Sequence, residues 1–187
     1  GRISGQEEGA GGKSAGELGV RANAVCGRLG GGILVMYGER ISVDTMGDDG
    51  AGALLAQMLN HSTPQGWKVL HGGSAPENAL HQIRAYAPTH VVVVDAADMD
   101  LPPGSIRQIP EDVLENPFFF TTHTIPLTFF INILREYVQE ITFIGIQPEI
   151  VAFGYPISSS VTQAVTTLYE CIQADPSGWF KQTTTLQ

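Results

Sequence analysis

Short apolar runs alternate with amphipathic stretches along most of this chain. ILVMY at residues 33–37 and the four valines within THVVVVDAADM at 89–99 are continuous apolar segments, typical of strands that are buried on both faces of a parallel sheet. GAGALLAQMLNH at 50–61 has its leucines and methionine at helical spacing. The same patterns predict further strands at 67–71, 104–110 and 141–148, and further helices at 76–88, 125–140 and 158–173.

Strands that alternate with helices predict an α/β fold, because each helix can carry the chain back to start a parallel neighbour. We expect a three-layer sandwich, with a mostly parallel, twisted sheet and helices on both of its faces. The segment GSIRQIP at 104–110 is a weaker strand pattern with a proline at its end, which favours an edge position. In such sheets, functional sites lie beyond the carboxyl ends of the strands.

Composition divides the chain into one domain and two tails. Residues 1–31 are rich in Gly, Ser and Glu and hold few core-forming side chains, so we expect a disordered tail. Residues 32–175 carry the alternating pattern and form a single α/β domain. Residues 176–187 are expected to be a carboxyl-terminal tail.

Charge and cysteine usage narrow the function classes. The net charge is −9, from 10 basic and 19 acidic residues, which argues against a nucleic-acid partner or an anionic membrane surface. No apolar run reaches membrane-spanning length, and no signal-peptide pattern is visible. Two cysteines, Cys26 and Cys171, are too few for a disulfide scaffold. We therefore expect a cytoplasmic monomer that binds no nucleic acid and inserts into no membrane.

The turn MGDDGAG at residues 46–52 places two carboxylates between glycines, directly before a predicted helix. Adjacent side chains rarely point the same way. One of Asp48 and Asp49 could therefore cap the helix, and the other could face a ligand. Capping alone is the more common role of such a pair.

Two further polar residues fall at the same predicted edge of the sheet. Asp95 directly follows the four valines, where a buried charge needs a partner, a hydrogen-bonded cap or a metal ion. His123 precedes a helix in TTHTIPL, and a single loop histidine is most often structural. Taken with Asp49, these residues would supply two carboxylates and one imidazole, a donor set that suits a divalent ion such as zinc or nickel. Asp98 is expected to be a solvated turn residue.

Several other chemistries lack their motifs. The GDDGAG turn is not G-x-G-x-x-G, and the sequence holds no G-x-x-x-x-G-K-[ST], so nucleotide binding has little support. No G-x-S-x-G elbow is present for a serine hydrolase, and no H-E-x-x-H pair for a zinc protease. The metal-binding set at the sheet edge therefore remains the leading candidate.

Six motifs in order make the chain resemble the hydrogenase maturation proteases, over about residues 33–171. They are GDDGAG, GGSAPEN, VVVVDAADM, LPPGSIR, TTHTIPL and GIQPEIVAFGYP. Within that family, they look most like the type that serves the hydrogenase of formate hydrogenlyase.

The resemblance implies an endopeptidase that removes the carboxyl-terminal extension of a nickel–iron (NiFe) hydrogenase large-subunit precursor after nickel insertion. It implies that Asp49, Asp95 and His123 form the metal site and carry the catalysis. It also implies that the substrate's nickel is the element recognised, although zinc or another divalent ion could occupy the same donors. Asp48 would support the turn or cap the helix. Cleavage by a metal-activated water and cleavage by an aspartyl mechanism both remain open.

One departure from the family pattern affects the loop before the acidic turn. The family has a Gly-Asn pair here, whereas this chain has Gly38-Glu39, and its loop up to Gly47 is longer than such connections usually are. This change could alter substrate fit or abolish cleavage. The alternative function is therefore a non-catalytic metal-binding or chaperone-like module in hydrogenase assembly.

Overall fold

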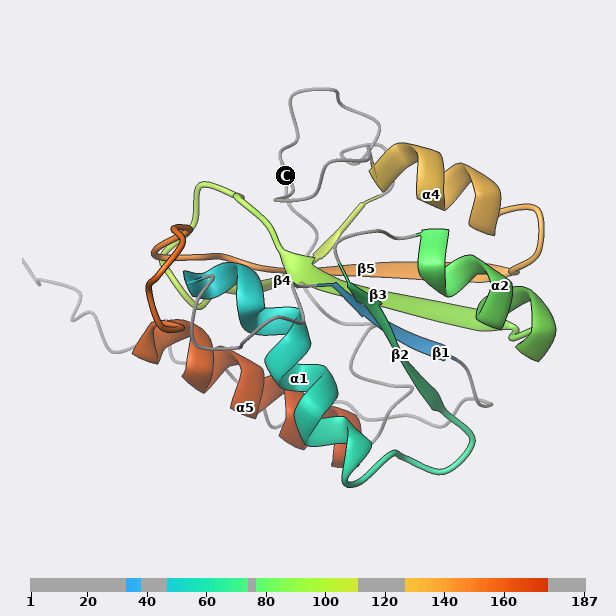
Figure 1. Ribbon diagram of the computed structural model, residues 1–187, viewed down its shortest axis with the longest axis horizontal. Coiled ribbons are helices and arrows are strands. Elements are labelled where there is room, and N and C mark those ends of the chain that lie inside the picture. The colour runs from blue at the N-terminus through green and yellow to red at the C-terminus, as the bar shows by residue number, and fades with distance from the viewer. Residues whose placement is uncertain (1–32, 38–46, 74–76, 111–126, 175–187) are drawn as a thin grey trace, which may run out of the picture.

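The structure is a computed structural model that describes residues 33–37, 47–73, 77–110 and 127–174. Its five strands form one sheet in the order β2-β1-β3-β5-β4 (Figure 1). The strands are β1 (Ile33–Tyr37), β2 (Lys68–Gly73), β3 (His90–Ala96), β4 (Ile106–Ile109) and β5 (Glu140–Ile146). The predicted tails at 1–31 and 176–187, His123 and the Gly38-Glu39 pair lie outside the described residues.

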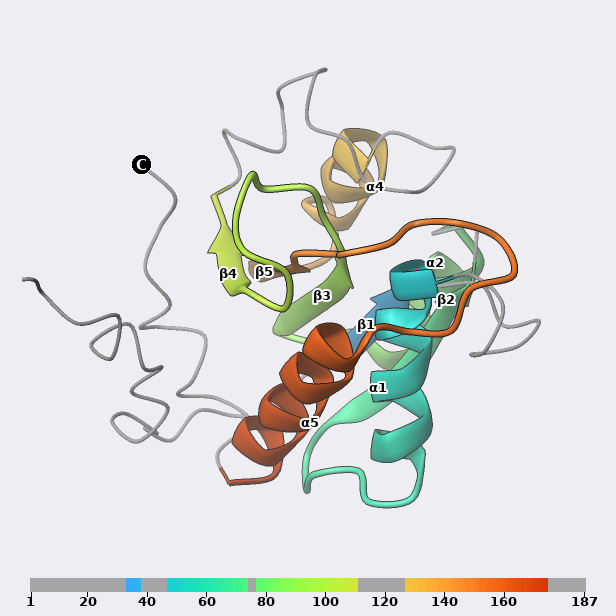
Figure 2. The ribbon, with the colours of Figure 1, turned by 90° about the vertical axis from the view of Figure 1, so that its left-hand side faces the viewer.

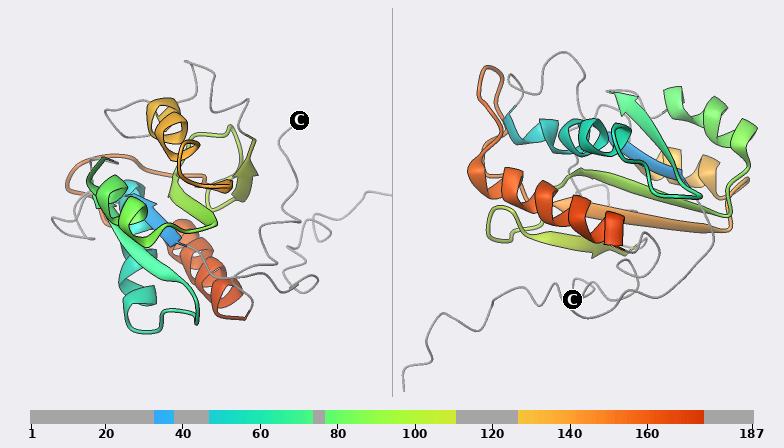
Figure 3. Two further views of the ribbon diagram at one scale, coloured as in Figure 1. Left: turned by 90° about the vertical axis from the view of Figure 1, so that its right-hand side faces the viewer. Right: turned by 90° about the horizontal axis from the view of Figure 1, so that it is seen from below.

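Helices cover both faces of this sheet, as predicted for a three-layer sandwich (Figures 1 and 2). The helical elements are the short 3-10 turn η1 (Gly47–Gly50), α1 (Ala51–Asn60), α2 (Glu77–Tyr86), α4 (Leu127–Leu134) and α5 (Ser159–Ala174). The helices α1 and α5 contact each other and cross one face together (Figure 3), whereas α2 and α4 pack on the other. None of the helices in the described ranges is long and apolar enough to span a bilayer.

The central strand β3 explains why its valines are continuous. All seven of its residues are buried. Val91 and Val93 belong to the core beneath α2 and α4, whereas Val92 and Val94 belong to the core shared with α1 and α5. Because successive side chains of a strand point to opposite faces, a strand between two helical layers needs apolar residues at every position.

The edge strand β4 runs antiparallel to β5, while β1–β2, β1–β3 and β3–β5 pair in parallel. The edge position was predicted, and the sheet is mostly parallel as expected. The direction of β4 follows from its connection to β3, which spans residues 97–105 and contains no helix. A parallel neighbour needs a crossover of a dozen or more residues, so the short loop returns the chain in the opposite direction.

The helix predicted at 125–140 is shorter in the structure, since α4 ends at Leu134. Backbone bonds then change from helical spacing at Arg135 N–Ile131 O to tighter turns at Tyr137 N–Leu134 O, both 2.9 Å. The turns lead Val138, 8% exposed, into the core before β5 begins. The helix therefore ends six residues before the predicted 140, and Val138 packs in the core outside it.

The strand order defines where a ligand site is expected. From β1 the chain moves to β2 on one side, and β3 then pairs on the other side of β1. The layers reverse as well, because α1 covers one face and α2 the other. Such a reversal is a topological switch point, and open α/β sheets bind ligands at its carboxyl-terminal edge.

Candidate active site

Asp49 and Asp95 lie on the two elements that flank this switch point. Asp49 belongs to η1, which leads from β1 into α1 and contacts β3. Asp95 is the next-to-last residue of β3. Both side chains are buried, with Asp49 4% and Asp95 0% exposed. Two of the three predicted ligands therefore come from the same edge of the sheet.

The packing around Asp95 fixes its direction. Asp95 lies two residues after Val93 and four after Val91 on the strand, so its side chain points to the same face, which α2 and α4 cover. Its Oδ1 accepts a hydrogen bond from the Ala96 backbone N–H at 2.8 Å. This bond holds the carboxylate close to the strand end.

The neighbouring strand carries a glycine beside Asp95. The partner of Asp95 in β5 is Gly145. A methyl group there would stand 2.6 Å from Ile109 Cδ1 and 2.9 Å from Met99 Sδ. The absence of a side chain on Gly145 thus lets the β3–β4 loop and β4 pack closely against β5, next to the carboxylate.

Asp48 has a different role from Asp49. Its carboxylate is fully buried and accepts four hydrogen bonds from the segment between β5 and α5. Oδ2 accepts from Glu149 N at 2.7 Å, Ile150 N at 2.9 Å and Ser158 Oγ at 3.0 Å, and Oδ1 accepts from Ser158 N at 2.7 Å. The alternative in which Asp48 caps α1 is wrong, because the cap position is Gly50 and both oxygens of the Asp48 carboxylate are bound by residues 149–158. Asp48 instead fastens the acidic turn to the start of α5.

The segment 147–158 therefore runs past the short turn η1 that precedes α1, as Figure 2 shows from the left-hand side of Figure 1. Gly47 N donates to Tyr155 O and Asp48 N donates to Ile150 O, both at 2.8 Å. Gly47 has φ +61°, and a methyl group there would stand 2.5 Å from Ile150 O. Only glycine permits this backbone conformation and this close approach together.

Gln147 is a buried residue of the site that the sequence patterns did not single out. Its Oε1 accepts from Met99 N at 2.7 Å, and its Nε2 donates to Asp98 Oδ1 at 3.2 Å. It thus holds the loop that follows Asp95 against the end of β5. The signal that identified Asp95, a polar residue directly after a buried apolar strand, also applies to Gln147 and could have found it.

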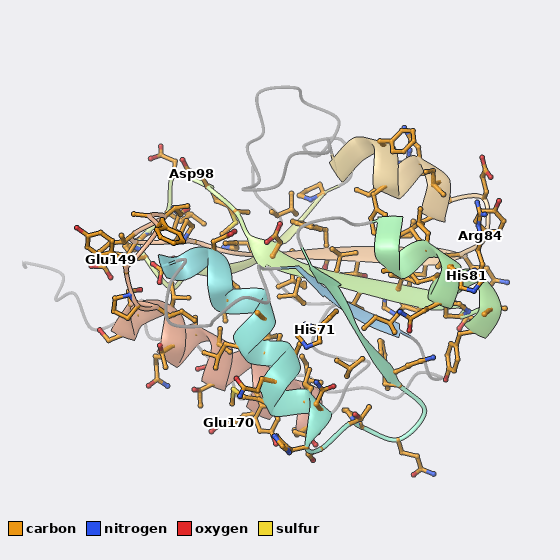
Figure 4. The ribbon with its side chains drawn as sticks, viewed as in Figure 1. His71, His81, Arg84, Asp98, Glu149 and Glu170 are labelled. Carbon is orange, nitrogen blue, oxygen red and sulfur yellow. The ribbon has the colours of Figure 1, made fainter. Side chains whose placement is uncertain are left out.

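Asp98 was expected to be a solvated turn residue, and the structure agrees. Asp98 is exposed and its Oδ1 accepts from Asp100 N at 3.3 Å, as suits a turn residue. Figure 4 shows Asp98 and Glu149 at the carboxyl-terminal end of the sheet, with His81 and Arg84 at the opposite end. Within the described ranges, no three His, Cys, Asp or Glu side chains form a group that could hold a metal ion. Because His123 lies outside those ranges, the predicted triad of ligands stays a prediction.

Comparison with known proteins gives consistent matches. Residues 53–175 match the sequence model of the hydrogenase maturation proteases. The chain is 45% identical over 138 residues to the hydrogenase 3 maturation protease of Escherichia coli, covering 73% of this chain and 88% of that protein.

Solved structures agree. The solution structure of the endopeptidase HycI from Escherichia coli superposes with a TM-score of 0.67 at 44% identity, over 74% of this chain and 86% of that one. The crystal structure of a NiFe hydrogenase maturation protease from Thermococcus kodakarensis superposes with a TM-score of 0.66 at 26% identity. The match covers 76% of this chain and 89% of that one.

Proposed function

Since the chain belongs to the hydrogenase maturation proteases, we propose that it removes a carboxyl-terminal extension from the large-subunit precursor of a NiFe hydrogenase after nickel insertion. The family makes it a hydrogenase maturation endopeptidase that acts on such a precursor. The position of the cut, the role of nickel and the residues that act belong to the proposal. We place the reaction in the cytoplasm, where nickel insertion precedes it.

The observation that carries the proposal is the pair of buried carboxylates, Asp49 and Asp95, on either side of the switch point. Oxygen donors joined by the imidazole of His123 suit nickel or zinc. This donor set supports a site that binds a metal ion. In the proposed reaction, that ion is the nickel of the substrate.

In this proposal, the nickel is part of the substrate and serves as its recognition element. Asp49 and Asp95, with His123, hold the substrate so that its scissile peptide bond lies beside the two carboxylates. A metal ion held by these donors would polarise the carbonyl or make a bound water more acidic. One of Asp49 and Asp95 would then accept the proton of the attacking water as general base, while the other and His123 would keep the metal. Zinc or another divalent ion would occupy the same donors in the absence of substrate.

The test is cleavage of purified large-subunit precursor from the same organism, with and without nickel. Wild-type protein should process the nickel-loaded precursor and leave the nickel-free form intact. Asp95→Asn and His123→Ala should each reduce processing roughly a hundredfold or more, and the double variant should be little worse, because ligands of one site act as a unit. Asp100→Asn is the matched control, since it changes an exposed carboxylate on the β3–β4 loop and should process normally.

Each alternative has its own outcome in this assay. Equal cleavage of both precursor forms would remove nickel from the recognition step and favour an aspartyl mechanism without metal. Full processing by folded His123→Ala protein would remove that residue from the site. Stable binding of the precursor by wild-type protein with no cleavage would instead indicate the chaperone-like module.

A further inference from the structure

Large apolar side chains are exposed on one short segment beside the candidate site. In the part of the chain that the structure describes, seven such side chains are exposed, and four of them lie between residues 150 and 155. They are Ile150 at 38%, Val151 at 52%, Phe153 at 82% and Tyr155 at 53% exposed. Apolar residues scattered singly on a surface need no explanation, but a concentration of them marks an interaction site.

The backbone of this segment is held in place. Ile150 is bound twice to Asp48, through its N–H and its carbonyl, and the Tyr155 carbonyl accepts from Gly47 N. In addition to its bonds with Asp48, Ser158 accepts a hydrogen bond at its Oγ from Val161 N at 3.3 Å. This bond fixes the junction with α5. The four side chains are therefore presented by a fastened loop. Binding then costs less conformational entropy than it would for a loop that must first be ordered.

These side chains do not serve the described interior. Neither of the two hydrophobic cores includes any of the four, whereas Ile157, further along the same segment, does pack against the core shared by α1 and α5. At the tip, Gly154 has φ +85°, and a methyl group there would meet nothing within 4 Å. The tip, with Phe153 beside it, thus stands in open space.

The location of the loop identifies its partner. Asp48 fastens the loop, and the next residue is Asp49, so the apolar surface and the candidate ligand form one rigid unit. A protein that brings a peptide bond to Asp49 must cover the surface next to it. Resting on the proposed function above, we propose that Ile150, Val151, Phe153 and Tyr155 form a preformed docking surface for the folded hydrogenase large-subunit precursor, with the Phe153 and Tyr155 rings as anchors.

Aromatic anchors of this kind carry much of the binding energy in protein interfaces. The surface would bind the precursor at a place separate from its nickel and from the extension that is cleaved. It would thus contribute to the choice between different hydrogenase precursors that carry the same metal centre. A second copy of this chain is the competing occupant.

The experiment compares Phe153→Ser, the double variant Phe153→Ser/Tyr155→Ser and wild-type protein. Tyr86→Ser is the matched control, because Tyr86 is 45% exposed and ends α2 at the opposite edge of the sheet. KM and kcat are measured for processing of the nickel-loaded precursor. Biolayer interferometry measures direct binding of the precursor, and analytical ultracentrifugation measures self-association. Phe153→Ser should raise KM by about tenfold or more with kcat nearly unchanged, and the double variant should raise it further. The control should match wild type in KM, kcat and precursor binding, and circular dichroism should show that all variants are folded.

An unchanged KM and unchanged binding for the double variant would overturn the docking surface while leaving the proteolytic function in place. A loss of self-association with unchanged KM would assign the surface to a homodimer and would likewise overturn it. If wild-type protein binds the precursor through Phe153 but does not cleave it, the docking inference stands and the proposed proteolysis fails. The two failures are therefore distinguishable.

Discussion

At the scale of single residues, the acidic turn shows how two adjacent carboxylates take different roles. Asp48 accepts four hydrogen bonds from the β5–α5 segment, and Asp49 lies beside β3 at the switch point. From the sequence, replacement of Asp48 would cost no more than a helix cap, about 1 kcal/mol. The structure revises that expectation upward, because the carboxylate joins two separate parts of the molecule.

We predict that Asp48→Asn lowers the free energy of unfolding by about 2–3 kcal/mol, because the amide nitrogen must then face at least one buried N–H donor. Oδ1 and Oδ2 both accept backbone N–H groups, so neither orientation of the amide avoids the mismatch. For a domain of this size, the melting temperature should fall by about 5–10 °C. Thermal unfolding followed by circular dichroism measures the effect. Asp100→Asn, at an exposed position, should change little. A melting temperature of Asp48→Asn equal to that of wild type would contradict the joining role.

At the scale of elements, the contact between η1 and the β5–α5 segment depends on one glycine. We predict that Gly47→Ala destabilises the protein by about 3 kcal/mol or more, since it combines left-handed backbone strain with a clash against the Ile150 carbonyl. Gly154→Ala is the matched control, because φ is also positive there but a methyl group meets nothing within 4 Å. It should cost only the strain, about 1–2 kcal/mol. Urea titration gives both values, and equal losses would show that the close approach at Gly47 is not required.

Element types were predictable from the sequence, whereas element ends and directions depended on contacts. The valines of β3 identified a central strand, and the apolar spacing at 158–173 identified α5. The end of α4 at Leu134 was missed, because the apolar spacing continues to Val138. The antiparallel direction of β4 was not stated, although the short connection at 97–105 carries that information.

At the scale of the whole molecule, the described cores draw only on the domain predicted at 32–175. We predict that deletion of residues 1–30 shifts the melting temperature by no more than about 2 °C, because their composition supplies few side chains for a core. As a positive control, Leu168→Ala removes a fully buried side chain between the sheet and α5 and should cost about 2–5 kcal/mol. Differential scanning calorimetry compares the two proteins. A drop after the deletion as large as that of Leu168→Ala would mean that residues 1–30 belong to the folded core.

The sequence by itself determined the layered fold and the edge of the sheet where the site lies. Both follow from local patterns, because apolar periodicity sets each element and parallel strands bring their carboxyl ends together. It also singled out Asp95 at the end of a strand and the Asp48-Asp49 pair at the start of a helix, whereas the choice of Asp49 as the proposed ligand came from the family resemblance. Only the tertiary structure decided that Asp48 binds residues 149–158 and that Gln147 holds the loop after Asp95. These contacts join segments about a hundred and about fifty residues apart. Hydrogen bonds of this kind depend on how the elements meet in space, and no local pattern of apolar and polar residues encodes that meeting.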